Sequence, residues 1–146
     1  MIALVTNILV YAHREELPSH AEARACIEQL VANGQRFALP WPCVHEFFSV
    51  VTHPRRFHPP STTRQAFDFL EALRQTGLSV WLSEGDLHLD QLKSLAVSSR
   101  VSGPQIHDMR IAALCLAHGV RELWTADPDF PRCPSLKIRN PLIARR

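Results

Sequence analysis

Apolar and polar residues along this chain fall into blocks, and the blocks predict short strands separated by helices. The first eleven residues, MIALVTNILVY, are uncharged and rich in β-branched side chains, which is typical of a strand buried on both faces of a parallel sheet. Shorter apolar runs predict further strands at residues 36–39, 78–82, 120–125 and 135–139. The sequence therefore predicts a mainly buried sheet that begins at the N-terminus.

Between these strands, apolar residues recur at helical spacing. From residue 23 to residue 31 they follow a 3.6-residue period, with Ser19 as a candidate N-cap and Gly34 as a stop signal. Similar patterns predict helices over residues 42–52, 62–75, 84–99 and 104–118. Strands that alternate with helices imply right-handed crossovers and a parallel sheet covered on both faces. We therefore expect a single α/β domain over residues 1–146, a three-layer α/β/α sandwich with a central, mostly parallel sheet.

Composition narrows the function classes only a little. The chain has 146 residues, a net charge of +2 and 46% hydrophobic residues, so any nucleic-acid binding must depend on local patches. Its four cysteines contain no CxxC pair, which argues against a zinc site or redox motif and fits reduced thiols. No apolar run approaches the roughly 20 residues of a membrane span. We expect a soluble, cytoplasmic protein without a membrane partner.

Two carboxylates stand out because their neighbours are apolar. Glu46 is the only acid or strong base between Arg36 and Arg55, and Asp108 lies on the apolar side of the helix predicted over residues 104–118. Burying an unpaired charge costs several kcal/mol, so each acid predicts a partner: a cationic side chain in the core, or a metal ion. Taken alone, Glu46 also fits a salt bridge or an exposed helix position, and Asp108 fits a favourable place in the helix dipole.

More oxygen-bearing side chains are predicted at one edge of the sheet. Asp127 and Asp129 follow the strand over residues 120–125, in an Asp-Pro sequence that also suits a plain turn, and Thr6 and Asn7 interrupt the first apolar run, as a bulge would. Open α/β sheets bind ligands at the carboxyl ends of their strands. Together with the two acids above, four segments bring oxygen ligands that favour Mg²⁺ or Mn²⁺, which can activate water and neutralise a phosphodiester.

Basic residues form two local clusters. Arg55 and Arg56 lie in a proline-rich loop and could hold a phosphate backbone. Arg139, Arg145 and Arg146 form a second cluster near the C-terminus, for which surface solubility is the simpler interpretation. The chain contains no HExxH, GxSxG, GxGxxG or P-loop motif, so neither a zinc protease, a serine hydrolase nor a nucleotide-cofactor enzyme is indicated.

Four stretches resemble the PIN domain family, and within it the VapC-type toxins of toxin–antitoxin pairs. They are IALVTNILVYA, WPCVHEFFSVVTHPRRF, HDMRIAALCLAHGV and LWTADPDFPRCPSLKIRNPL. The resemblance implies a small α/β/α sandwich, a divalent-metal-dependent endoribonuclease and a homodimer kept inactive by a cognate antitoxin. By motif match, it implies metal-ligand roles for Glu46, Asp108 and Asp127 and an additional acid at Asp129. It also matches Thr6 and Asn7 to the polar pair that follows the family's first strand.

The sequence departs from this family at Val5. The family opens with Asp-Thr-Asn, and its first Asp is a direct metal ligand, whereas this chain has Val5-Thr6-Asn7. A hydrocarbon side chain cannot coordinate a cation, and losing a group that positions the metal can cost several kcal/mol in the transition state. We therefore expect a correctly folded domain with weak or absent nuclease activity, whether the valine is natural or introduced.

Two other functions remain compatible with the residues. One is a non-catalytic PIN-fold module that binds antitoxin or RNA, favoured by Val5 and disfavoured by retention of the other acids. The other is a receiver-like signalling domain, which lacks its expected lysine here, because Lys93 falls in a predicted helix and Lys137 lies too near the end. Apolar side chains of the helical half could form a dimer face or receive an antitoxin's amphipathic segment. These candidates are Phe47, Phe48, Phe57, Phe67 and Phe69.

Overall fold

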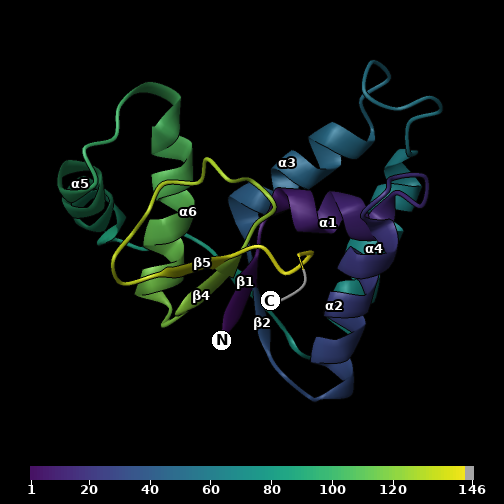
Figure 1. Cartoon of the computed structure of the whole chain (residues 1–146), viewed down its shortest axis with the longest axis horizontal. Coiled ribbons are helices and arrows are strands. Elements are labelled where there is room, and N and C mark those ends of the chain that lie inside the picture. Colours follow the sequence, from purple (N-terminus) through teal and green to yellow (C-terminus); the bar gives the residue numbers. More distant parts are fainter. Residues whose placement is uncertain (144–146) are drawn as a thin grey trace.

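The computed structural model describes residues 1–143, and at its centre lies a parallel five-stranded sheet in the order β3-β2-β1-β4-β5 (Figure 1). Arg145 and Arg146 of the second basic cluster lie outside the described residues. The strands are β1 (Ile2–Leu4), β2 (Phe37–Pro40), β3 (Ser79–Leu82), β4 (Glu122–Trp124) and β5 (Lys137–Arg139). The prediction of a parallel sheet is confirmed.

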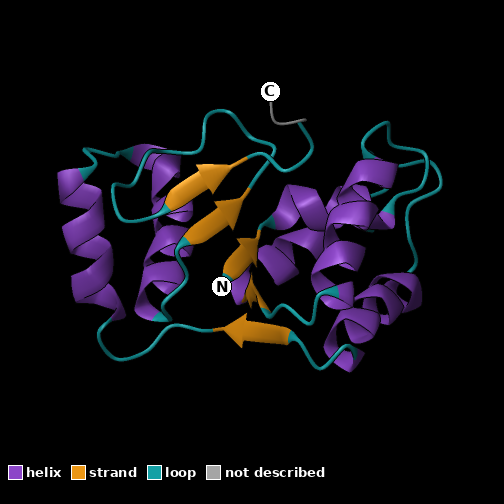
Figure 2. Ribbon diagram, turned by 60° about the horizontal axis from the view of Figure 1, so that its bottom comes forward, coloured by secondary structure: helices purple, strands orange, loops and turns teal. Residues whose placement is uncertain are grey.

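Helices cover both faces of this sheet, which gives the predicted three layers (Figure 2). They are α1 (Thr6–His13), α2 (His20–Ala32), α3 (Trp41–Val51), α4 (Thr63–Gln75), α5 (His88–Ser98) and α6 (Ile106–Ala117), with a short 3-10 turn, η1 (Gly103–Gln105), before α6. One core lies between the sheet and α1 to α4 and contains Leu9, Leu30 and Phe47. The other lies beneath α6 and contains Met109 and Leu123.

The first predicted strand is wrong beyond its fourth residue. β1 ends at Leu4, and Thr6 begins α1, whose first-turn bond runs from the Leu9 amide to the Val5 carbonyl. The run is buried in both conformations, and a short apolar run cannot by itself distinguish a buried strand from a buried helix. Because the turn into α1 follows β1 directly, Thr6 and Asn7 stand at the carboxyl end of the strand.

Smaller differences concern where helices start. Ser19 makes no capping bond at α2, and α5 begins at His88, several residues after the predicted start. By contrast, α4 begins close to its predicted position, where Thr62 and Gln65 form a reciprocal capping box with distances of 3.1 and 2.9 Å. The capping motif in the sequence thus predicts the start of α4 to within one residue.

The phenylalanines proposed as a partner surface differ in their exposure. Phe47 is fully buried, while Phe67 is 56% exposed. Phe48, Phe57 and Phe69 are partly buried against the first core. Phe47 is therefore a core residue and cannot be part of a partner surface.

Candidate active site

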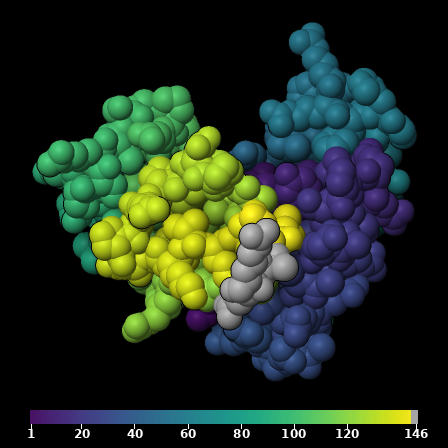
Figure 3. Space-filling model, viewed as in Figure 1, coloured from purple at the N-terminus to yellow at the C-terminus, as the bar shows by residue number. Residues whose placement is uncertain are grey.

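A pocket of about 590 Å³ opens where the carboxyl ends of β1 and β4 meet α3 and α6. It lies where the molecular surface is hollowed between the green α5–α6 side and the teal loop that follows α3 (Figure 3). Its polar and charged lining comes from five separate segments and comprises Thr6, Asn7, Tyr11, Glu46, Arg56, Asp108, Thr125 and Asp127. The structure therefore brings together most of the site residues predicted from the sequence.

Glu46 and Asp108 approach the pocket from opposite helices. Glu46 lies on the exposed side of α3, with the Thr6 hydroxyl donating to its Oε2 at 3.3 Å. Asp108 is half-buried in the first turn of α6. Burial raises the pKa of the Asp108 carboxyl, and the negative charges of Asp127 and Glu46 raise it further. The carboxylates are thus close enough to repel one another.

Asp127 is held by a buried hydroxyl that the sequence analysis missed. Thr125 is 2% exposed, and its Oγ1 accepts from the Asp127 amide and from Asn7 Nδ2, each at 3.1 Å. Asn7 Oδ1 in turn accepts from the Ala126 amide at 3.0 Å. The Asn7 side chain therefore ties the start of α1 to the loop after β4. A threonine at the end of a predicted strand and two residues before an acid was the available signal.

Asp129 and Arg55 do not line the pocket. The Asp129 amide donates to Asp127 Oδ1 at 2.8 Å, which forms the tight turn that an Asp-Pro sequence favours. Arg55 is exposed in the loop after α3, whereas its neighbour Arg56 reaches the pocket. The structure thus separates each of these predicted pairs.

Val5 lines the pocket at the position where the family resemblance implies a metal-binding Asp. It is 5% exposed, takes an extended backbone conformation at the start of α1, and packs within the second core beside Cys43 and Ala3. Its methyl groups offer no donor atom. Burial raises the pKa of the neighbouring Cys43 thiol to about 12, so that residue stays neutral as well. The valine therefore leaves this side of the pocket without an anionic ligand.

The remaining donors suit a hard cation in type, but they are not assembled as a ligand set. Carboxylates and hydroxyls are the groups that Mg²⁺ and Mn²⁺ prefer. Within residues 1–143, none of the three pocket acids is ion-paired to an Arg, Lys or His side chain. Among the same residues, no group of three His, Cys, Asp or Glu side chains is arranged closely enough to hold a metal ion.

Comparisons with known proteins agree with this architecture. Residues 2–136 match the family model of the PIN domain. Ribonuclease VapC43 of Mycobacterium tuberculosis is 32% identical over 142 residues, which are 97% of this chain and 96% of the relative. Ribonuclease VapC31 of the same organism is 32% identical over 143 residues, 97% of this chain and 100% of the relative.

Solved structures show the same fold at lower identity. VapBC2 from Rickettsia felis, bound to a promoter DNA fragment, aligns with a TM-score of 0.67 and 20% identity, covering 96% of this chain and 98% of that one. FitAcB from Neisseria gonorrhoeae aligns with a TM-score of 0.62 and 19% identity, covering 97% of this chain and 98% of that one.

None of the helices formed by residues 1–143 has the length and apolarity that crossing a bilayer requires.

Proposed function

This chain belongs to the PIN domain family as an endoribonuclease toxin of the VapC type, and we propose that its activity depends on Mg²⁺ or Mn²⁺ held by Glu46, Asp108 and Asp127. The observation that carries the proposal is the convergence of these three acids, from three separate elements, on one pocket where none of them forms an ion pair among residues 1–143, although Arg56 lines the same pocket. Uncompensated carboxylates that share a pocket are better explained by a ligand than by stability.

The chain's own residues place the acids for this role. A divalent cation there would supply Lewis-acid activation of water and offset the charge of the RNA phosphodiester. Thr6 orients Glu46 through its hydroxyl, and the Asn7–Thr125 pair fixes the backbone that carries Asp127. Burial and the negative charges of the other acids raise the pKa of Asp108, so this carboxyl takes up a proton more readily than an exposed aspartate does.

Val5 weakens this site. We propose that cation affinity is reduced. The family resemblance implies four metal-binding carboxylates, and at one of these positions this chain has a hydrocarbon side chain that is 5% exposed. The same observation favours a second candidate function, a PIN-fold module that binds antitoxin or RNA without cutting it. The two functions differ in their need for a metal.

The decisive experiment compares this chain with its Val5→Asp variant. RNA cleavage is measured with Mg²⁺ and with Mn²⁺, and Mn²⁺ binding by titration calorimetry. We expect Val5→Asp to raise the cleavage rate by roughly 100-fold or more, the effect of restoring one group that stabilises charge in a transition state. The double variant Val5→Asp/Asp108→Asn, which keeps the added carboxylate but loses an original one, should be inactive.

Other results favour the binding module. If Val5→Asp leaves total RNA intact and neither protein takes up Mn²⁺, the metal-dependent mechanism is wrong for this chain. The metal-dependent mechanism is supported if the unmodified chain binds Mn²⁺ measurably, Val5→Asp binds it more tightly, and the double variant does not bind it.

A proposed antitoxin site lies away from the carboxylates. A groove of about 970 Å³ runs between the end of α1, α2 and α4, with apolar side chains at Ile27 and Phe69 and acids at Glu28 and Asp68. This lining suits an amphipathic segment that carries basic residues. We propose that the cognate antitoxin binds here, and that an antitoxin arginine can reach the pocket acids. A homodimer is proposed on the family resemblance alone.

A further inference from the structure

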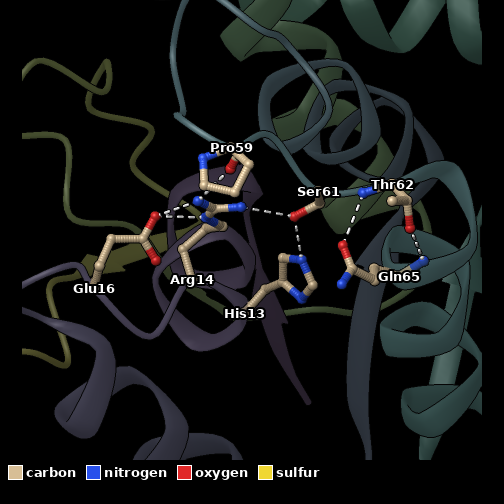
Figure 4. A network of polar contacts seen from close by, with 7 residues as sticks. All are labelled: His13, Arg14, Glu16, Pro59, Ser61, Thr62 and Gln65. Carbon is tan, nitrogen blue, oxygen red and sulfur yellow. Dashed lines mark hydrogen bonds and ion pairs between the residues drawn. The ribbon is translucent and has the colours of Figure 1, made fainter.

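Arg14, directly after α1, is the centre of a polar network at the far end of that helix from the carboxylate pocket (Figure 4). Its side chain is only 12% exposed. Nη1 donates to Ser61 Oγ at 3.1 Å, Nη2 to the Pro59 carbonyl at 2.9 Å, and Nε to Glu16 Oε1 at 2.7 Å. A nearly buried guanidinium with all three nitrogens engaged fixes the groups around it.

Ser61 connects Arg14 to His13 by hydrogen bonds. Ser61 is 5% exposed, and its Oγ lies 2.8 Å from His13 Nε2. Burial lowers the pKa of His13, and the positive charge of Arg14 lowers it further, so the imidazole is neutral at neutral pH. Arg14 can only donate, so the Ser61 hydroxyl accepts from Arg14, and the same oxygen shares a hydrogen bond with His13 Nε2. One buried hydroxyl therefore links the guanidinium to the imidazole.

The same guanidinium holds the loop between α3 and α4. The Arg14 Cζ atom lies 4.4 Å from the centroid of the Phe57 ring, a cation–π contact. Phe57 is partly buried against the first core, and its amide and that of Arg56 both donate to the His53 carbonyl. Arg14 thus contacts the loop at Phe57 and Pro59 and its exit at Ser61.

Arg56 projects from this loop to the carboxylate pocket. It is exposed, lines the pocket, and is the one Arg or Lys among the described lining residues. Within residues 1–143 it forms no ion pair, although Glu46, Asp108 and Asp127 line the same pocket. An unpaired guanidinium beside three carboxylates offers a nucleic-acid backbone a positive contact in an otherwise repulsive pocket.

We infer that Arg14 is a positioning residue, which holds the loop of residues 53–60 so that Arg56 binds a phosphate of single-stranded RNA at the mouth of the carboxylate pocket. The inference rests on the proposed function, because it takes RNA as the ligand. It adds a role for Arg14, which lies outside the pocket. It also distinguishes Arg56, which lines the pocket, from Arg55, which does not.

The test measures RNA affinity and loop mobility on separate samples. Binding of a fluorescent single-stranded RNA is titrated without divalent cations at several salt concentrations. Arg56→Gln should weaken binding and reduce the slope of log K against log salt by about 0.7, the value for one phosphate contact on single strands. Arg14→Met should reduce the slope by the same amount, and the double variant should lose no more than either single variant.

Loop mobility is read from trypsin cleavage, which needs no RNA. Trypsin should cleave the Arg14→Met variant after Arg55 and Arg56 faster than it cleaves the unmodified chain. Phe57→Leu keeps an apolar side chain in the core but removes the cation–π contact, and should give a smaller change of the same kind. Circular dichroism at the assay temperature confirms that each variant is folded. The charge-matched control is Arg64→Gln, an exposed residue of α4, which should leave the salt slope and the trypsin rate unchanged.

Each arm can overturn the inference. An unchanged trypsin rate in folded Arg14→Met and Phe57→Leu shows that Arg14 does not hold the loop. Faster cleavage with an unchanged salt slope, or losses at Arg14 and Arg56 that add independently, shows that the loop does not serve RNA binding. If the unmodified chain binds no RNA, the proposed function fails with it, while the trypsin rates still report separately on the loop.

Discussion

The two ends of α1 differ in their electrostatic interactions, which are repulsive at one end and attractive at the other. At its N-terminal end, Glu46, Asp108 and Asp127 share a pocket in which like charges face one another. At its C-terminal end, Arg14 and its partners form a network in which each donor has an acceptor. The first arrangement lowers stability and the second raises it. A short helix thus connects a region shaped for a ligand to a region shaped for rigidity.

This contrast separates two kinds of buried polar group that look alike in a sequence. A satisfied network holds its own shape, whereas unmatched charges persist only where a bound partner compensates for them. Removing a charge from the pocket should therefore raise the free energy of unfolding, whereas adding a charge there or removing a member of the network should lower it.

The largest effect should come from adding charge to the pocket. Val5→Asp places a carboxylate at a site that is 5% exposed and beside other acids. In metal-free buffer, we expect it to lower the free energy of unfolding by about 2–4 kcal/mol, measured by urea denaturation. Mn²⁺ should restore part of this loss.

Val5→Asn is the matched control, with the same size and polarity but no charge. It should be less destabilising than Val5→Asp, and Mn²⁺ should not rescue it. Equal losses in the two variants, both insensitive to Mn²⁺, would show that charge crowding is not what distinguishes this end of the helix.

The second effect comes from breaking the network. Ser61→Ala removes the hydroxyl that accepts from Arg14 and shares a hydrogen bond with His13, and leaves both groups short of a partner. We expect a loss of about 1–3 kcal/mol in the free energy of unfolding. Ser49→Ala, on the exposed side of α3, should change it by less than about 0.5 kcal/mol. Similar values for the two variants would mean that the network adds little rigidity.

The smallest effect should have the opposite sign. Asp108→Asn relieves the desolvation and repulsion that raise the pKa of this carboxyl. In metal-free buffer, we expect a gain of less than about 1 kcal/mol in the free energy of unfolding, because solvent screens part of the repulsion at this half-buried group, together with loss of Mn²⁺ binding. Asp90→Asn is a matched control, because Asp90 is an exposed acid in the first turn of α5. It should be neutral or slightly destabilising through the helix dipole, and destabilisation by Asp108→Asn would contradict the comparison.

The pocket acids were predicted from their joint placement. Glu46 and Asp108 lie in apolar helices and Asp127 follows a strand, but each of them alone also fits a structural role. Their expected meeting at one edge of the sheet, together with the family resemblance, indicated a site. The boundary between β1 and α1 was missed, since a short apolar run that is buried either way carries no periodicity to separate strand from helix. Thr6 and Asn7 still lie at the expected edge of the sheet, although they follow β1 directly and do not interrupt a longer strand.

Residues that act through others were harder to predict. Thr125 is a single buried hydroxyl, and its importance appears only when Asn7 and Asp127 are seen to share it. Arg14 reads in the sequence as a surface charge next to two glutamates, and its burial depends on a loop more than 40 residues away. Tertiary contacts of this kind leave no local pattern in the chain.

The pocket also has a consequence for the timing of synthesis. Its walls are contributed by segments from Val5 to Phe130, and β4 must pair with β1 before Asp127 can reach its place. Such long-range pairing forms late, after most of the polypeptide has left the ribosome. A nascent or prematurely terminated chain therefore lacks a complete set of acids, so a cell translating this toxin is exposed to it only once each copy is nearly finished.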